Sequence, residues 1–177
     1  MSEYSIVPAQ ECHVAALAEI ELAAAQLLIG YAPHSVLSEA TARTVLVEAA
    51  HDGHLWVALS GDTPVGFALV EMLAPDLPHL QEIDVHPAHG RRGIGTALVR
   101  AVCAWSTGNG YPQLTLTTFR AVRWNMPFYS RLGFVEIPPD KLPPQLAAVV
   151  AQEAARGLLP TARVVMAYRC PATATAP

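Results

Sequence analysis

Residues 85–99 read VHPAHGRRGIGTALV, so glycines and arginines stand directly before an apolar helical pattern. The first amide N–H groups of a helix have no partners within the helix and carry partial positive charge. Glycines let a ligand come close to the backbone, and arginines add forked cationic donors. The pattern predicts an anion site, most simply for a phosphate; the alternative is an ordinary strand-to-helix turn. The residues assigned to this site are Gly90, Arg91, Arg92, Gly93, Ile94, Gly95 and Thr96.

Titratable side chains lie on the predicted strand before this turn, HLQEIDV at residues 79–85. Alternate side chains of a strand share a face, so Glu82 and Asp84 are expected on one face and His79 on the other. Burial can raise the pKa of a carboxyl group, and an imidazole titrates near neutral pH without help. The strand therefore offers acid–base chemistry next to an anion site. A solvated strand face for Glu82 and a loop position for His79 are the alternatives.

Hydrophobic periodicity and turn residues predict the elements that must position these groups. Their order is strand, two helices, three strands and then helices alternating with strands, which indicates a mixed α/β fold with an antiparallel first half. The strands are expected at residues 4–7, 55–61, 63–73, 79–85, 113–119, 134–137 and 162–169. The helices are expected at residues 14–29, from Ser35 or Ser38 to about Ala50, and at 94–107, 125–133 and 143–157.

Composition narrows the class of protein. The chain has 177 residues, a net charge of -4 and 52% apolar residues, which favours a globular protein over a disordered chain or a general nucleic-acid binder. Its three widely spaced cysteines suggest neither a metal site nor a disulfide framework, and a reducing cytoplasm is expected. No signal peptide or membrane-crossing run is found. We predict one domain over residues 1–170 and a disordered tail over 171–177.

Two common phosphate-binding turns do not fit, because neither G-x-x-x-x-G-K-[ST] nor G-x-G-x-x-G occurs here. The stretch EIDVHPAHGRRGIGTALV, followed by a strand and then FYSRLGF, instead resembles the GNAT superfamily of acetyl-CoA-dependent N-acetyltransferases. The two parts are similar to its pyrophosphate-binding motif V-x-P-x-x-[RQ]-x-x-G-x-[GA] and its later Tyr-x-x-x-Gly-Phe motif. This chain departs from the pattern at Gly90, the Arg/Gln position, and at Val122, where the family often has asparagine. Asn125 is therefore assigned either to the cofactor or to a helix N-cap.

The resemblance implies a GNAT-like α/β (α+β) fold. Its central sheet would be mixed and largely antiparallel, with about six to seven strands, flanked by helices and splayed between the fourth and fifth strands. It also implies acetyl-CoA as co-substrate and no metal. The pantetheine arm would pair with the backbone of Ile83 and Val85, and the N–H of Val85 or of a neighbour on this strand would hold the oxyanion formed at the thioester.

The resemblance further implies direct acetyl transfer to a primary amine within a ternary complex. An alkylamine has a pKa of ~10.4 and arrives protonated, so a base is needed. Glu82 is the first candidate for this base, His79 the second, and a water molecule is the remaining alternative. Tyr129 matches the tyrosine that the family uses as the general acid toward the departing thiolate.

The acceptor is expected to be a small-molecule amine, and its identity is not readable from the sequence. The regions that shape the acceptor site in the family hold Tyr31, His34, Arg123 and Trp124 here. Two alternatives stay open: a non-catalytic acyl-CoA-binding or sensor module, and a protein N-terminal or lysine acetyltransferase. A homodimer is a further expectation, formed through an exposed edge of the closing strand at residues 162–169.

Overall fold

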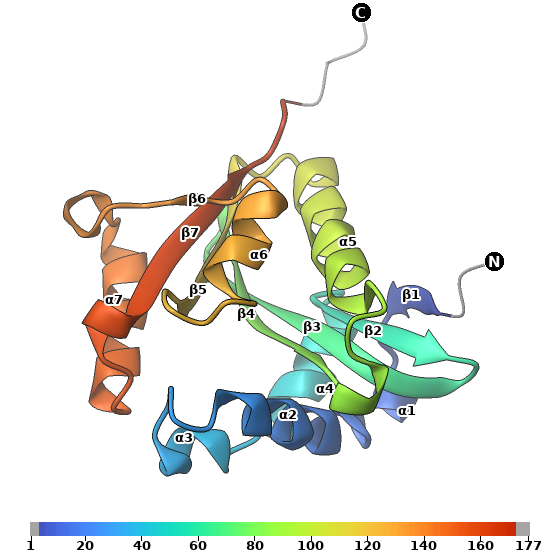
Figure 1. Cartoon of the computed structure of the whole chain (residues 1–177). Coiled ribbons are helices and arrows are strands. Elements are labelled where there is room, and N and C mark those ends of the chain that lie inside the picture. The colour runs from blue at the N-terminus through green and yellow to red at the C-terminus, as the bar shows by residue number, and fades with distance from the viewer. Residues whose placement is uncertain (1–3, 173–177) are drawn as a thin grey trace, which may run out of the picture. The chain divides into compact units, whose positions relative to one another are not determined.

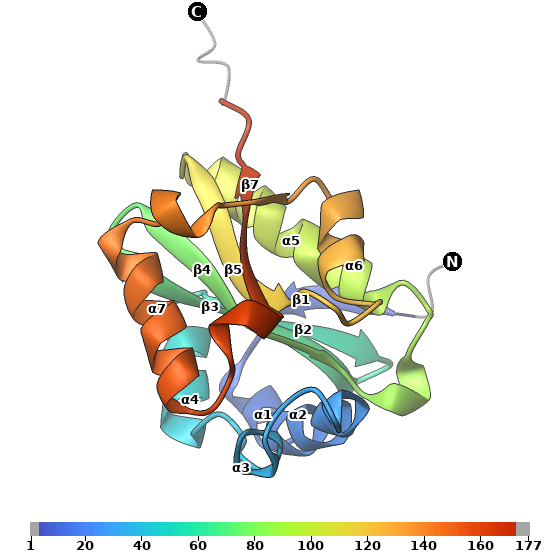
Figure 2. The ribbon, with the colours of Figure 1, turned by 60° about the vertical axis from the view of Figure 1, so that its left-hand side comes forward.

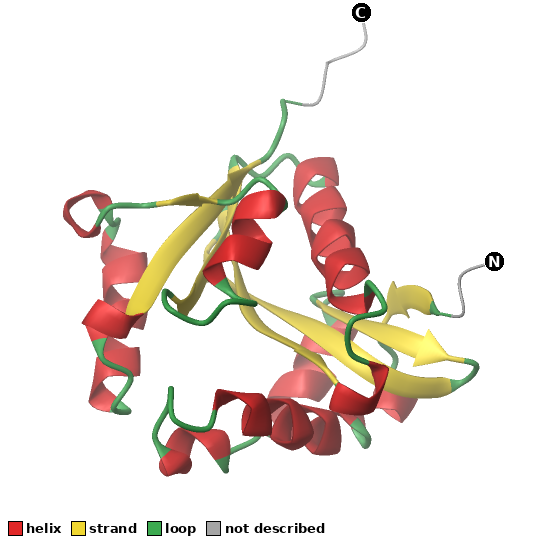
Figure 3. Cartoon of the chain, viewed as in Figure 1, coloured by secondary structure: helices red, strands yellow, loops and turns green. Residues whose placement is uncertain are grey.

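Seven strands form one mixed sheet in a computed structural model that describes residues 4–172 (Figure 1). The strand order is β1-β2-β3-β4-β5-β7-β6, which confirms the predicted GNAT-like α/β fold class (Figure 3). The backbone groups into two compact units, Met1–Glu71 with Gln81–Val102 and Met72–Leu80 with Cys103–Pro177. These are called the first and second unit.

The first unit joins an antiparallel meander to short helices. Its strands are β1 (Ser5–Pro8), β2 (Leu55–Ser60), most of β3 (Thr63–Ala74) and the later part of β4 (Leu77–Val85). Its helices are α1 (Glu11–Val14), α2 (Leu17–Ala25), α3 (His34–Leu37), α4 (Arg43–His51) and the first half of α5 (Ile94–Gly108), with 3-10 turns at Gln26–Leu28 and Pro87–His89. Leu17 of α2 and Leu46 of α4 pack against Val57 and Phe67 of the sheet in one buried cluster, and Figure 2 shows these helices along the strands.

The second unit is built on β5 (Gln113–Phe119) and β7 (Arg163–Arg169), which pair antiparallel over their full length. The start of β4 pairs with β5 in parallel, with His79 opposite Thr115. The remaining elements are α6 (Met126–Arg131), β6 (Val135–Glu136), α7 (Pro144–Ala155) and 3-10 turns at Pro139–Lys141 and Pro160–Ala162. Leu77, Leu146 and Val165 form a buried cluster between α7 and the strands.

Gly66 marks a close approach of two strands. It lies opposite Ala58, next to a register shift between β2 and β3. A Cβ at residue 66 would lie 2.8 Å from the carbonyl oxygen of Asp84 and 3.2 Å from Cγ2 of Val85. Because the nearer atom belongs to the backbone, it cannot turn away as a flexible side chain would. Glycine at this position therefore allows β3 to lie against the end of β4.

We expect Gly66→Ala to destabilise the protein by about 1–3 kcal/mol, because the added methyl group forces β4 away from β3. Urea unfolding measures this change. Gly108→Ala is the matched control, since a Cβ there meets nothing within 4 Å and alanine favours a helix. Equal unfolding midpoints for wild type and Gly66→Ala would show that the approach of β3 to β4 does not require glycine at this position.

Two predicted helices are interrupted in the structure. The helix expected at 14–29 begins earlier, at Glu11, and is divided into α1, α2 and a 3-10 turn. The helix expected from Ser35 or Ser38 to about Ala50 is wrong as one element, because α3 ends at Leu37 and α4 begins at Arg43. The Ser38 hydroxyl donates to the His34 carbonyl at 2.8 Å, and the Thr41 amide donates to the Glu21 carboxylate at 2.8 Å. The Ser38 N–H still donates to the His34 carbonyl at 3.0 Å, but the Thr41 N–H is taken by the Glu21 side chain and not by a carbonyl of the preceding turn, so the helix does not continue.

The other predicted elements are confirmed to within a few residues, and the strand at residues 113–119 agrees at both ends. The exposed edge expected for the closing strand is wrong, because β7 lies between β5 and β6 and pairs with both. A homodimer itself stays a prediction. Residues 173–177 of the predicted disordered tail lie outside the described residues. In the part of the chain that the structure describes, no helix has the length and apolar character needed to cross a membrane.

Candidate active site

The predicted anion site is the turn between β4 and α5, in the first unit. Arg91 and Gly93 both adopt positive φ, at 58° and 80°. A Cβ at residue 93 would meet nothing within 4 Å, so this glycine is needed for its conformation and not for space. The first backbone bond of α5 runs from the Ala97 N–H to the Gly93 carbonyl at 3.0 Å. By helix geometry, the N–H groups of residues 94–96 have no partner within the helix and are suited to an anion.

An N-terminal tyrosine contacts one of the two arginines of this turn. Arg92 Nη1 donates to the Tyr4 hydroxyl at 2.5 Å, and the Tyr4 hydroxyl lies 3.4 Å from Nδ1 of His89. The His86 ring caps the 3-10 turn by accepting from the Ala88 N–H at 3.3 Å. Side-chain bonds therefore hold both ends of the turn. Gly90 ends the 3-10 turn, and its N–H donates to the Pro87 carbonyl at 3.1 Å.

In the first unit, the Asp84 carboxyl group interacts with two other carboxyl groups, those of Glu82 and Glu21. Glu82 and Asp84 are neighbours on one face of β4, as the strand alternation predicts, and Glu21 comes from α2. Burial raises the pKa of Asp84 well above its usual value, and the charges of Glu82 and Glu21 raise it further. The Glu21 carboxylate accepts from the Thr41 N–H at 2.8 Å and from the Thr41 hydroxyl at 3.0 Å.

His79 lies inside the second unit, where it is 3% exposed. Its Nδ1 is 2.9 Å from Oγ1 of Thr115, and the Thr115 hydroxyl lies 3.2 Å from the Pro78 carbonyl. A carbonyl can only accept, so the single hydroxyl proton goes to Pro78 and His79 Nδ1–H donates to Thr115. Burial lowers the pKa of His79 to about 4, against a smaller opposing effect of Glu153. The ring is therefore neutral at physiological pH.

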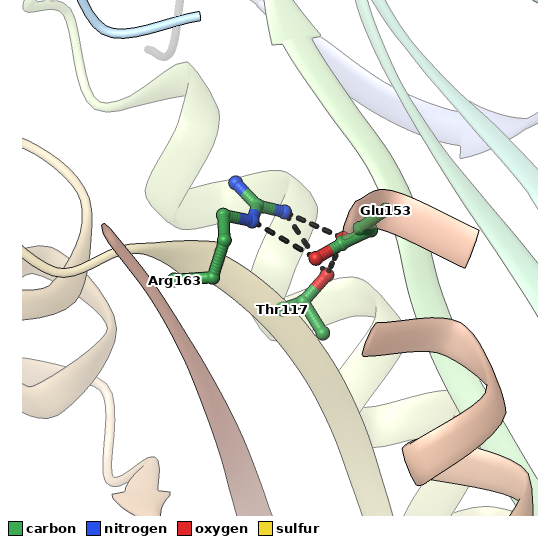
Figure 4. A network of polar contacts seen from close by, with 3 residues as sticks. All are labelled: Thr117, Glu153 and Arg163. Carbon is green, nitrogen blue, oxygen red and sulfur yellow. Dashed lines mark hydrogen bonds and ion pairs between the residues drawn. The ribbon is translucent and has the colours of Figure 1, made fainter. Parts of the chain in front are cut away.

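A polar network joins α7 to β5 and β7 in the second unit (Figure 4). Arg163 donates through Nε and Nη2 to the two oxygens of Glu153, at 3.0 and 2.7 Å, and Nη2 also donates to Thr117 at 3.1 Å. The Thr117 hydroxyl donates to Glu153. The two charged side chains are only 11% and 16% exposed. This is a buried, bidentate ion pair, which is the strongly directional kind.

Tyr129 lies on α6 of the second unit and is 8% exposed. Its ring makes edge contacts with Phe128 and Phe134, at centroid distances of 5.0 and 5.7 Å. Asn125 occupies the N-cap position of α6, but its side chain makes no capping hydrogen bond. The four candidate acceptor residues are all exposed: Tyr31 and His34 in the first unit, Arg123 and Trp124 in the second.

The family model described as the Acetyltransferase (GNAT) family matches residues 19–134, well over half of the chain. The chain belongs to the GNAT acetyltransferase family. It is therefore an N-acetyltransferase, and members of this family use acetyl-CoA as the acetyl donor. The match includes both the turn between β4 and α5 and the Tyr129 motif.

Solved structures agree on the fold. The PaiA N-acetyltransferase of Thermoplasma acidophilum, in complex with coenzyme A, is 14% identical with a TM-score of 0.74, over 94% of this chain and 98% of that one. Rv2747 of Mycobacterium tuberculosis, also in complex with coenzyme A, is 21% identical with a TM-score of 0.63, over 93% and 98%. The ribosomal-protein-S18-alanine N-acetyltransferase of Escherichia coli is 17% identical with a TM-score of 0.65, over 98% and 99%.

Three residues that lie at the anion-site turn or among the interacting carboxyl groups were not predicted as site residues from the sequence. Asp84 was placed on the correct face, but alternation does not reveal how deeply a side chain is buried. Glu21 lies in an Ala- and Leu-rich helix where nothing local separates it from Glu19. Tyr4 contacts a residue 88 positions away, which no short-range pattern can indicate.

Proposed function

We propose that this GNAT enzyme transfers the acetyl group of acetyl-CoA to a primary amine of a small molecule, by direct attack within a ternary complex. The observation that carries the proposal is the turn before α5, where two residues with positive φ precede a 15-residue helix. Alternating left-handed and right-handed residues point successive N–H groups toward one side, which suits a diphosphate. The backbone of residues 90–96 holds that diphosphate, and Arg91 and Arg92 add positive charge.

Glu82 acts as the base in this proposal, with Asp84 as its partner. The acceptor reaches the enzyme as an ammonium ion, and the Glu82 carboxylate takes one of its protons and passes it to solvent. The Asp84 side chain is hydrogen-bonded to Glu82, and burial together with the charges of Glu82 and Glu21 raises the pKa of Asp84, so Asp84 takes up a proton at a higher pH than a lone carboxyl group. His79 remains the second candidate, although a pKa of about 4 makes it a weak base.

The neutral amine then forms a C–N bond to the thioester carbonyl carbon. The backbone N–H of Val85, with the neighbouring backbone of Ile83, stabilises the oxyanion, and such donors can contribute ~3 kcal/mol. When the C–S bond breaks, the Tyr129 hydroxyl gives its proton to the thiolate. The second proton of the attacking nitrogen is released to solvent, from which Tyr129 is reprotonated. Asn125 is assigned to the coenzyme, and Tyr31, His34, Arg123 and Trp124 to the acceptor.

Thiol release from acetyl-CoA, followed with and without butylamine, tests this proposal. We expect release only with the amine, and we expect Tyr129→Phe to lower kcat about tenfold or more with little change in acetyl-CoA affinity, because the thiolate loses its proton donor. Tyr111→Phe is the control, since the Tyr111 ring contacts the Trp105 ring at a tilt of 47°, and phenylalanine keeps this contact. Wild-type kcat in Tyr129→Phe would remove Tyr129 from the mechanism. Transfer to peptides but to no small amine would contradict the proposed acceptor class.

A further inference from the structure

Arg91 has an unfavourable backbone conformation. Among the described residues it is the only one other than glycine with a positive φ, at 58°. A side chain at such a φ crowds the backbone, so residues like arginine adopt it rarely and at a cost in energy. Strained residues of this kind persist only where the surrounding structure holds them, and they gather at functional sites. Arg91 lies in the turn assigned to the coenzyme, so its conformation affects where the N–H groups of that turn point.

The Tyr4 hydroxyl contacts residues on both sides of Arg91. It accepts a hydrogen bond from Arg92 Nη1 at 2.5 Å, and it lies 3.4 Å from Nδ1 of His89. A guanidinium group can only donate, so the hydroxyl is the acceptor in the first contact, and in the second it can donate to a neutral imidazole. The Tyr4 and His89 rings also meet edge to face, with their centroids 6.0 Å apart. One hydroxyl therefore bridges residues 89 and 92, with Gly90 and Arg91 between them.

The sheet of the first unit holds both the tyrosine and the start of the turn. Tyr4 directly precedes β1, and all four residues of β1 pair with β2. At the start of the turn, the His86 N–H donates to the Val65 carbonyl of β3 at 2.9 Å. All of these residues belong to the first unit. The contacts of Tyr4 therefore restrain the turn relative to the strands.

We propose that Tyr4 is a positioning residue for the coenzyme. Its hydroxyl clamps the turn between β4 and α5 and keeps Arg91 in the left-handed conformation in which the turn binds a diphosphate. Tyr4 acts through Arg92 and His89, and this set of three residues is called the Tyr4 clamp. The inference rests on the proposed function, because the turn must hold the coenzyme, but it does not depend on which amine is acetylated. A turn that already has its binding conformation binds more tightly, because it is not ordered at the expense of affinity.

Calorimetry with coenzyme A tests the clamp through Tyr4→Phe, which removes the hydroxyl and keeps the ring. We expect coenzyme A to bind about fivefold more weakly or worse, because the free turn then has its binding conformation for only part of the time. With butylamine as acceptor, KM for acetyl-CoA should rise by a similar factor while kcat changes by less than about twofold. Tyr111→Phe, which removes a tyrosine hydroxyl from the second unit, is the matched control and keeps the wild-type affinity.

Substitutions of Arg91 separate a backbone role of Tyr4 from an electrostatic one. Alanine removes the charge and is strained at positive φ as arginine is, whereas glycine removes the charge and the strain together. We expect Tyr4→Phe to weaken coenzyme A binding about fivefold in the Arg91→Ala protein and less than about twofold in the Arg91→Gly protein. If Tyr4 acted only by directing the charge of Arg92, the losses in the two proteins would be equal.

NMR of the free protein gives a second readout that needs no ligand. We expect the ¹⁵N order parameters of residues 90–92 to be lower in Tyr4→Phe than in wild type and in Tyr111→Phe, because the turn has lost its restraint. Thermal unfolding of each variant confirms that it is folded. Unchanged order parameters in Tyr4→Phe would overturn the clamp.

The outcomes separate this inference from the proposed function. Wild-type affinity for coenzyme A in Tyr4→Phe, or equal losses in the Arg91→Ala and Arg91→Gly proteins, overturns the clamp and leaves the proposed acetyl transfer unaffected. Failure of the wild type to acetylate any amine contradicts the proposed transfer, while the calorimetric test of the clamp still decides. If the wild type does not bind coenzyme A, the turn is not a coenzyme site and the inference is overturned.

Discussion

Replacing Glu153 by methionine is expected to lower the free energy of unfolding by about 3–5 kcal/mol, because it leaves the buried Arg163 guanidinium without its counter-charge. Arg163 donates three hydrogen bonds in the network, two to Glu153 and one to Thr117. Only the bond to Thr117 survives the substitution, and that hydroxyl loses its own acceptor. Arg163 also lies over the Phe119 ring, 4.5 Å from its centroid, so it cannot easily turn toward water.

The double variant Glu153→Met with Arg163→Met gives the contrasting result. Removing both charges leaves methylene groups and sulfur of similar length in their place, and such replacements are often neutral or stabilising by about 1–4 kcal/mol. We therefore expect the double variant to be more stable than either single variant. Urea unfolding of the four proteins forms a double-mutant cycle that measures the coupling between the two side chains.

An exposed ion pair in the same unit is the matched control. Arg120 donates to both oxygens of Glu136, at 3.0 and 2.5 Å, but these side chains are 44% and 31% exposed. Removing one member of such a pair typically costs about 1 kcal/mol or less. If Glu153→Met were no more costly than Arg120→Met, the burial of the Glu153–Arg163 pair would not matter to stability.

The backbone of the anion site could be predicted from the sequence because its signal is local. Gly93 is required by its own φ, and α5 follows it with apolar residues at helical spacing. The strand at residues 113–119 is likewise set by its own alternation and β-branched residues, and it forms as expected. In both cases the residues that cause the structure are the residues that adopt it.

The interruption between α3 and α4, in contrast, could not be predicted from a local signal. Residues 35–50 carry a pattern suited to one helix, but Thr41 bonds to Glu21, 20 positions earlier. The surroundings of Asp84 also depend on other segments, since Gly66 of β3 lies against its backbone carbonyl and the charge of Glu21 of α2 acts on its carboxyl group. Local pattern therefore gives the face of a side chain, and only the assembled unit decides its pKa and its partners.

His79 is expected to make the protein lose about 3 kcal/mol of stability as the pH falls from 6.5 to about 4. Burial lowers its pKa from 6.5 in the unfolded chain to about 4 in the folded protein, and each pH unit of that gap corresponds to about 1.4 kcal/mol. The folded state binds fewer protons than the unfolded state in this range, so this contribution is complete above pH 6.5 and declines on acidification. Buried carboxyl groups act in the other direction. The raised pKa of Asp84 gives a contribution that is present in acid and is lost as the pH rises.

The contributions of His79 and Asp84 to the pH dependence of stability oppose each other, so unfolding of the wild type alone does not separate them. The difference in unfolding free energy between wild type and His79→Asn isolates the contribution of His79. Asparagine can keep an N–H directed at Thr115 and does not titrate. Since Asp84 is present in both proteins, its contribution cancels, and we expect the stability difference to change by about 3 kcal/mol between about pH 7 and pH 4. His51→Gln, an exposed histidine of α4, should show no such change. A pH-independent difference for His79→Asn, or an imidazole that titrates near its ordinary pKa by NMR, would mean that His79 is accessible to water and able to serve as the base in place of Glu82.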